Sequence, residues 1–185
     1  MPETGPDRYG DCGTPPKEAA VRRFIKELWL PYYRELEATV DAFSLADDVD
    51  LVTAELPFRV DRLDSAEYRT WIAIDGFTDG IPLADTDGEF AGYLAAEIDE
   101  APSVFDRPDR MFICDIYVGE PYRGTGLADD LFDRPRDWAH DAGCEEFSLD
   151  PHVDNDRANA FYEKLGFERT KYHMVASVED RRDHE

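Results

Sequence analysis

The chain has 185 residues and a formal net charge of −23, from 43 acidic against 20 basic side chains. Because affinity for nucleic acid depends on Lys and Arg that neutralise phosphates, this charge argues against a nucleic-acid partner, and anionic membrane surfaces would repel it equally. Apolar residues make up 42% of the chain, enough for a real core, yet no apolar run approaches the roughly 18 residues of a membrane span. We therefore expect a single-domain protein without nucleic-acid or membrane partners.

The carboxylates are scattered along the whole chain rather than clustered, which is typical of a solvated surface suited to high salt. Salt at about 1 M shrinks the Debye length to roughly 3 Å, so the self-repulsion of such a surface is screened there. We interpret the acidity as a sign of a halophilic source. The alternative is that acidic patches recruit a cationic substrate.

The start of the chain, residues 1–7, has neither the basic segment nor the apolar run of a signal peptide, which favours a cytoplasmic location. The cysteines are odd in number and far apart, and the histidines lack metal-ligand spacing, so we expect neither a disulfide framework nor a metal site. These residues are Cys12, Cys114 and Cys144, and His140, His152, His173 and His184.

One domain is expected over residues 14–178, between a flexible leader at 1–13 and a charged tail at 179–185. Thr14-Pro15-Pro16 predicts a helix start, with a hydroxyl cap and proline in the first turn. Pro31 falls inside the helical pattern and predicts a kink or split. The apolar stripe of this helix consists of Val21, Phe24, Ile25, Leu28, Tyr32 and Leu36.

A second helix is expected over about residues 50–63, and strands over 69–74 and 90–97. Asp87-Gly88 predicts a hairpin turn that leads into the second of these strands. Whether residues 69–74 or the short apolar run at 81–84 pair with that strand stays open.

Residues 111–118 predict a buried strand, by their length and β-branched content. A helix follows a glycine loop and ends at Gly143, and Pro135 within it is expected to bend it. Residues 145–149 predict the next strand. Strands and helices thus alternate in the order of an α/β fold.

The last predicted helix is capped by Asp154 or Asn155 and ends at Gly166. Residues 167–178 then predict a final strand or hairpin.

The segment Arg123-Gly124-Thr125-Gly126-Leu127-Ala128 joins the predicted strand to its helix. Amides at a helix N-terminus lack intrahelical partners and sit at the positive end of the helix dipole, and glycines let a bulky anion approach closely, so the loop suits a phosphate or pyrophosphate. It has no lysine, as a Walker loop requires, and Asp129 stands where a Rossmann fingerprint has its third glycine. The alternative is a plain strand-to-helix turn.

Together with a later segment, this loop resembles the GNAT superfamily of N-acetyltransferases. Its acetyl-CoA loop has the form Arg/Gln-x-x-Gly-x-Gly/Ala, which Arg123, Gly126 and Ala128 match. Further on, the family carries Asn-x-x-Ala and then Phe-Tyr-Glu-Lys-x-Gly-Phe, and the clear similarity covers residues 111–176. The corresponding segments are Asn155-Asp156-Arg157-Ala158 and Phe161-Tyr162-Glu163-Lys164-Leu165-Gly166-Phe167.

The resemblance implies the α/β GNAT acyl-CoA N-acyltransferase fold, with a mixed, mostly antiparallel central sheet flanked by about four helices and splayed at the strand before the glycine loop. It implies direct transfer of acetyl from acetyl-CoA to a primary amine, without a metal, and is compatible with a homodimer. The acceptor stays open among a protein N-terminus, a lysine, a polyamine, an amino acid and an antibiotic. A non-catalytic acyl-CoA sensor and an interaction module without cofactor are the alternatives.

For cofactor binding, the resemblance implies that the backbone amides of the loop cradle the CoA pyrophosphate. The side chain of Arg123 either touches phosphate or is exposed, and Asn155 either reaches the cofactor arm or serves as an N-cap. The strand end runs beside the pantetheine arm and polarises the thioester carbonyl through backbone groups. The implied cofactor-binding residues are Ile116, Tyr117, Val118, Arg123, Gly124, Thr125, Gly126, Leu127, Ala128 and Asn155.

For catalysis, Tyr162 matches the family's tyrosine and is the candidate general acid that protonates the CoA sulfur; the alternative is a core tyrosine. Many relatives carry Glu-Asp in the central strand, where this chain has Cys114 and Asp115. Asp115 is the candidate base, acting through water, or else it anchors backbone or substrate. Cys114 is either an acetylated nucleophile or a small buried residue, and the family's direct transfer favours the second.

Overall fold

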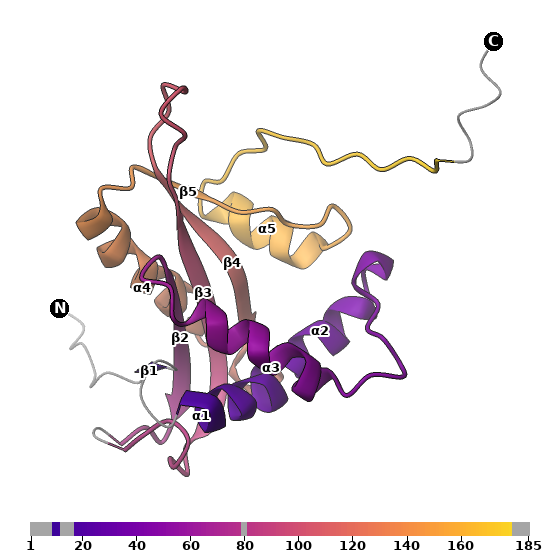
Figure 1. Ribbon diagram of the computed structural model, residues 1–185, viewed down its shortest axis with the longest axis vertical. Coiled ribbons are helices and arrows are strands. Elements are labelled where there is room, and N and C mark those ends of the chain that lie inside the picture. The colour runs from indigo at the N-terminus through magenta and orange to yellow at the C-terminus, as the bar shows by residue number, and fades with distance from the viewer. Residues whose placement is uncertain (1–8, 12–16, 79–80, 179–185) are drawn as a thin grey trace.

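The computed structural model describes residues 9–11, 17–78 and 81–178, which form a five-stranded sheet with helices on both faces (Figure 1). The strand order is β1-β2-β3-β4-β5, and all neighbours are antiparallel except the parallel pair β4–β5. The expected mixed, mostly antiparallel sheet is therefore confirmed. The strands are β1 (Tyr9–Asp11), β2 (Tyr68–Asp75), β3 (Glu89–Asp99), β4 (Arg110–Val118) and β5 (Glu146–Ser148).

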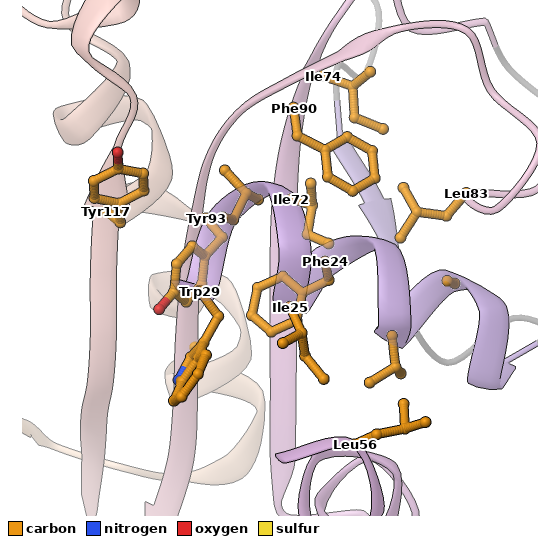
Figure 2. Packing of buried hydrophobic residues seen from close by; sticks show 14 of the residues in the cluster. Phe24, Ile25, Trp29, Leu56, Ile72, Ile74, Leu83, Phe90, Tyr93 and Tyr117 are labelled. Carbon is orange, nitrogen blue, oxygen red and sulfur yellow. The ribbon is translucent and has the colours of Figure 1, made fainter. Parts of the chain in front are cut away.

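Helices α1 to α3 pack against one face of the sheet, and α4 and α5 pack against the other. Figure 2 shows the first core, in which Phe24, Ile25 and Trp29 meet Ile72 and Tyr93. Among the described residues, no helix is both long and apolar enough to cross a membrane. The helices are α1 (Lys17–Phe24), α2 (Leu30–Glu37), α3 (Leu51–Arg62), α4 (Leu127–Ala142) and α5 (Asp156–Lys164), with short 3₁₀ turns at Asp41–Phe43 and Glu120–Tyr122.

Pro31 changes the winding of the first helix without ending it. The predicted start at residues 14–16 lies outside the described residues, and the helix is followed from Lys17 onward. Between α1 and α2 the segment Ile25–Trp29 is π-helical, with the Leu30 amide bonded to the carbonyl of Ile25. Because proline has no amide proton to donate, the predicted break takes the form of this wider turn directly before Pro31.

The other predicted helices are found close to their expected bounds. Asp50 caps α3 by accepting a hydrogen bond from the Thr53 amide, and Asn155 rather than Asp154 caps α5 through the Ala158 amide. Gly143 ends α4 in the left-handed conformation (φ 77°). Pro135 lies inside α4, where its ring is buried.

The β2–β3 connection differs from the prediction. Strand 69–74 is the partner of 90–97, but Asp75 pairs with Glu89, so the connection is the whole loop 76–88 and not a tight turn at Asp87-Gly88. The loop is held against α1 because Leu83 is buried in the core and Arg23 donates to the Gly88 carbonyl at 2.7 Å. These tertiary contacts are not visible in a turn signal.

Two further differences lie at the ends of the chain. Residues 9–11, within the expected leader, form β1 beside Trp71–Ala73 of β2. The predicted strand at 167–178 is wrong, because this segment has no strand structure and runs away from the sheet in Figure 1. Phe167 still packs against the core, but Tyr172, Met174, Val175 and Val178 are solvent-exposed, with Met174 89% exposed. Strand propensity alone is not enough, because a strand also needs a neighbouring backbone to pair with.

The sheet opens between β4 and β5. Only Arg110–Phe112 of β4 pair with β5, although β4 continues to Val118. In the described part of the chain, no strand pairs with this edge of β4 beyond Phe112. The predicted splay at the strand before the glycine loop is thus confirmed.

Candidate functional site

A cleft of about 1120 Å³ lies where β4 and β5 separate. One wall is formed by α2 and the turn after it, and the opposite wall by the glycine loop and the first turn of α4. The segment from Leu149 to Ala158 and the side chains of Phe161, Tyr162 and Lys164 complete it. The cleft therefore collects every residue that the sequence marked as a candidate for cofactor binding, except Thr125, together with both catalytic candidates.

The glycine loop presents backbone to this cleft. Gly124 and Gly126 have positive φ angles of 73° and 93°, and an added Cβ at either position would meet nothing within 4 Å. Thr125 stabilises the turn by donating from its hydroxyl to the Tyr122 carbonyl at 2.7 Å. The Asp130 amide bonds to the Gly126 carbonyl, so the amides of residues 127–129 precede the first such bond and are available to an anion.

The side chain of Arg123 is occupied within the protein. Its Nε donates to the Val118 carbonyl at 3.0 Å, and its guanidinium is ion-paired with Glu35 of α2. Glu35 also accepts a hydrogen bond from the Tyr117 hydroxyl at 2.7 Å. The loop is thereby tied to both the strand end and the opposite wall, and of the two readings of Arg123 the geometry favours a contribution from its backbone alone.

Negative charge stands close to the loop. Asp129 and Asp130 lie in the first turn of α4, where they interact favourably with the helix dipole but would repel a bound anion. Lys164 of α5 lies 3.3 Å from the Asp129 carboxylate and offsets part of this charge.

At the strand end, Ile116 and Val118 pack toward α4 while Tyr117 packs toward the helices on the other face. Their side chains are thus used for packing, and their backbone borders the cleft. Earlier in β4 a β-bulge interrupts the alternation, since Ala95 pairs with Asp115 but Ala96 pairs with Ile113. The extra residue is Cys114.

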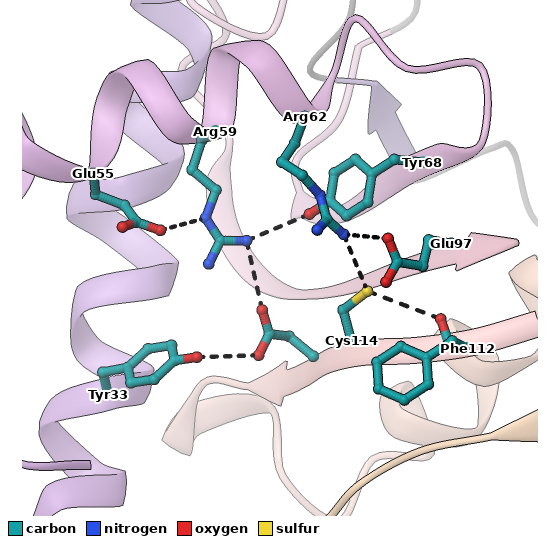
Figure 3. Close-up of polar contacts among 9 residues, drawn as sticks. Tyr33, Glu55, Arg59, Arg62, Tyr68, Glu97, Phe112 and Cys114 are labelled. Carbon is teal, nitrogen blue, oxygen red and sulfur yellow. Dashed lines mark hydrogen bonds and ion pairs between the residues drawn. The ribbon is translucent and has the colours of Figure 1, made fainter. Parts of the chain in front are cut away.

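Asp115 belongs to a buried polar cluster with Tyr33 of α2 and Arg59 of α3. Figure 3 shows Tyr33, Glu55 and Arg59 of this cluster. Its Oδ1 accepts a hydrogen bond from the Tyr33 hydroxyl at 3.5 Å, and its Oδ2 lies 3.6 Å from a guanidinium nitrogen of Arg59. The side chains of Asp115 and Arg59 are each 9% exposed. Burial raises the pKa of Asp115 to about 6, because Arg59 offsets only part of the desolvation.

Tyr162 borders the same cleft from α5. Its ring packs between Phe161 and Phe167, with centroid distances of 5.7 and 5.8 Å. Burial, with the nearby charge of Asp115, raises the pKa of Tyr162 to about 12. The phenol is therefore protonated at neutral pH and close enough to Asp115 to sense its charge.

Cys114 is a poor nucleophile in this setting. Its Sγ is 3.6 Å from a guanidinium nitrogen of Arg62, but burial and the carboxylates of Glu97 and Asp115 raise its pKa to about 12. Because the thiolate is the reactive form, a protonated thiol agrees with the reading of Cys114 as a small buried residue.

Asn155 is used as a helix cap, since its side-chain oxygen accepts from the Ala158 amide at 3.1 Å. The neighbouring Asn159 holds the preceding loop by donating to the carbonyls of His152 and Asn155, each at 3.0 Å. The geometry therefore supports the capping alternative for Asn155.

Several residues of the cleft and its polar cluster were not anticipated from the sequence: Tyr32, Tyr33, Glu35, Glu55 and Arg59. Glu55 and Arg59 are ion-paired at 2.7 Å on α3. Their spacing of four residues is the one available signal, but such pairs are usually exposed on helix surfaces. Among the residues that the structure describes, no group of three or more His, Cys, Asp or Glu is placed to hold a metal ion.

Comparison with known proteins gives the cleft its family context. Residues 45–167 match the model of the acetyltransferase (GNAT) family. The chain belongs to the GNAT family. This match includes the glycine loop, the splayed strand β4 and α5.

Curated relatives of this GNAT chain include acetyltransferases of different acceptors. It is 36% identical over 100 residues to the N-alpha-acetyltransferase MAK3 of Arabidopsis thaliana, covering 53% of this chain and 50% of the relative. It is 38% identical over 60 residues to an aminoglycoside N(6')-acetyltransferase type 1 of Acinetobacter genomosp. 13, covering 32% of this chain and 41% of the relative. The similarity thus spans about half the length of these curated relatives or less.

Solved structures agree on the fold. A tetramutant of the BH1408 protein of Bacillus halodurans superimposes with a TM-score of 0.66 at 16% identity, covering 92% of this chain and 99% of that one. The aminoglycoside N-acetyltransferase AAC(6')-Iy in complex with CoA gives a TM-score of 0.57 at 18% identity, covering 84% and 89%. At such identities the likeness establishes the GNAT fold and no more.

Proposed function

We propose that the protein is an acetyl-CoA-dependent N-acetyltransferase that transfers acetyl directly to a primary amine. The observation that carries this proposal is the meeting of Asp115 and Tyr162 in one cleft, at the unpaired edge of β4 and beside the N-terminus of α4. The acetylated acceptors in the names of the GNAT relatives, protein N-termini and aminoglycosides, are both amines.

The residues present suit coenzyme A. The open space at Gly124 and Gly126 and the amides of residues 127–129 offer a cradle for a pyrophosphate. The edge of β4 from Ile113 to Val118 offers backbone groups to an extended amide-containing arm. Acetyl-CoA supplies the activated acetyl thioester.

In the proposed reaction the amine nitrogen forms a bond to the acetyl carbon while the carbon–sulfur bond breaks. Asp115 accepts the proton that leaves the amine, directly or through water, and Tyr162 donates a proton to the departing sulfur. The pKa values of about 6 and about 12 leave Asp115 ionised and Tyr162 protonated at neutral pH. Negative charge develops on the thioester carbonyl oxygen in the transition state. A backbone N–H that donates to this oxygen contributes roughly 3 kcal/mol of stabilisation.

The lining of the cleft suits a cationic amine. Asp150 and Asp154 line it, and Tyr33, Phe43 and His152 form a chain of ring contacts with centroid distances of 6.0 and 5.9 Å. Carboxylates attract an ammonium group, and aromatic faces stabilise it.

The proposal is tested with a panel of amines, from peptides with free N-termini to polyamines and aminoglycosides, incubated with acetyl-CoA and scored by thiol release. We expect at least one amine to give turnover, and we expect Asp115→Asn to lose most of it. A melting temperature raised by CoA without turnover of any amine would identify an acyl-CoA sensor. No CoA-dependent change at all would identify an interaction module.

We also propose that the acidic surface is an adaptation to high salt. The net charge of −23 destabilises the folded state by self-repulsion, which molar KCl screens. The free energy of unfolding should therefore rise between low and molar KCl. Equal stability in both would assign the acidity to another role.

A further inference from the structure

The β-bulge in β4 turns two successive side chains to the same side of the sheet. In a regular strand Cys114 and Asp115 would face opposite sides. Here Cys114 packs against the core under α1 to α3, and Asp115 contacts Tyr33 and Arg59 of the same layer. A carboxylate in such a buried place requires a partner if it is to stay ionised.

Arg59 is the partner that the fold supplies. It is a buried arginine on the inner side of α3, with 8% of the whole residue exposed. Its Nε donates to Glu55 at 2.7 Å, while another guanidinium nitrogen lies 3.4 Å from the Tyr68 hydroxyl and 3.6 Å from Asp115. The planar guanidinium is thus fixed on one side and directed at Asp115 on the other.

We propose that Arg59 is a positioning residue for the reaction: from α3 it holds one oxygen of the Asp115 carboxylate while Tyr33 holds the other. This inference rests on the proposed function, since positioning has a consequence for turnover only if Asp115 takes the proton. Held at both oxygens, the carboxylate keeps one orientation at the edge of β4.

Arg59 also provides the positive charge next to Asp115. Among the residues that the structure describes, Arg59 is the basic side chain ion-paired with Asp115. Removing Arg59 therefore favours the protonated carboxyl and raises its pKa above about 6. The groups that face Asp115 are Glu55 and Arg59 of α3, Tyr32 and Tyr33 of α2, Tyr68 of β2, Tyr93 of β3, Cys114 of β4 and Tyr162 of α5.

The chain offers a matched control one turn further along α3. Arg62 is also ion-paired, to Glu97 at 2.7 Å, and stacks on Tyr68 at 4.3 Å, but it makes no ion pair with Asp115. Arg59→Met and Arg62→Met each remove one arginine from the same helix. A general loss of α3 stability should affect both variants, whereas loss of positioning should affect Arg59→Met alone.

The decisive measurement is the pH profile of kcat/KM, compared with the titration of the Asp115 carboxyl carbon by NMR, assigned with Asp115→Asn. In Arg59→Met we expect the acidic limb and the titration to move up together by about one pH unit or more. In Arg62→Met both should stay in place. Arg59→Met should add no further loss of kcat in the Asp115→Asn background.

Arg59→Lys serves where Arg59→Met does not fold, because lysine keeps the charge but cannot reach Glu55 and Asp115 together. We expect it to lower kcat about tenfold, with a smaller shift of the acidic limb. Wild-type kcat and pH profile in Arg59→Lys would overturn the proposal, as would a titration of Asp115 unmoved in Arg59→Met. A shifted titration in a protein that acetylates no amine would instead overturn the proposed function alone.

Discussion

The two walls of the cleft use different parts of the chain. On the side of α4, the glycine loop offers backbone amides, and the side chains around it are occupied elsewhere. On the side of α2 and α3, the polar groups are side chains, brought together from α2, α3, β2 and β4 (Figure 3). The first wall is specified within a few consecutive residues, whereas the second exists only once the chain has folded.

The largest effect is expected at Tyr162, which completes the cleft from α5 and, like the wall of α2 and α3, contributes its side chain. Phenylalanine keeps the ring contacts with Phe161 and Phe167 but removes the proton that the phenol donates. Tyr162→Phe should lower kcat by roughly 100-fold or more, with the affinity for acetyl-CoA changed little. Steady-state kinetics on an identified amine measures both.

A core role for Tyr162 would leave rate and stability nearly unchanged in this variant. A modest loss of rate with weaker acetyl-CoA binding would mean that the hydroxyl positions the thiol and does not protonate it.

On the backbone wall, Gly126→Asp should abolish CoA binding. At 100 times its dissociation constant, CoA should stabilise the wild type by roughly 2.7 kcal/mol, measured as a melting shift. The aspartate adds bulk and negative charge at the N-terminus of α4, where a Cβ otherwise meets open space. Gly143→Asp is the matched control, since Gly143 has a similar φ of 77° at the other end of α4 and the same open surroundings.

Both variants should lose stability through the strained backbone, but Gly143→Asp should keep the melting shift with CoA. An undiminished shift in a folded Gly126→Asp protein would place the cofactor elsewhere.

The same contrast explains what the sequence could predict. The loop from Arg123 to Ala128, the caps at Asn155 and Gly143, and the splay of β4 follow from local signals and from the family resemblance, and the structure has all of them. Arg59 and Tyr33 meet Asp115 across intervals of 56 and 82 residues, and no periodicity connects positions so far apart. The face of the sheet on which the Asp115 side chain lies depends on the bulge at Cys114. Strict alternation along the strand would have predicted the opposite face.

A smaller effect is expected at Asn155, where the family motif suggests the cofactor arm and the structure shows a cap. Asn155→Ala should lower the free energy of unfolding by about 1 kcal/mol, because the Ala158 amide loses its acceptor. Asn155→Ser should restore most of that stability, since serine also caps. If the serine variant is stable but binds CoA clearly more weakly in a titration, Asn155 contacts the cofactor in addition to capping α5.

The smallest effect is expected at Arg123. It is the basic residue of the glycine loop, and its charge alone would suggest a contact with phosphate. Its guanidinium is engaged by Glu35 and by the Val118 carbonyl, so a phosphate would have to compete with both partners. The pair with Glu35 is partly exposed, and such pairs contribute at most about 1 kcal/mol. Arg123→Ala should therefore change the dissociation constant of CoA by less than about threefold, measured by calorimetry.

A loss of CoA affinity of tenfold or more, accompanied by a weaker salt dependence of binding, would show that the Arg123 side chain leaves Glu35 for the pyrophosphate. In that case the two walls would not differ as described, because a side chain from the motif would bind the anion together with the backbone.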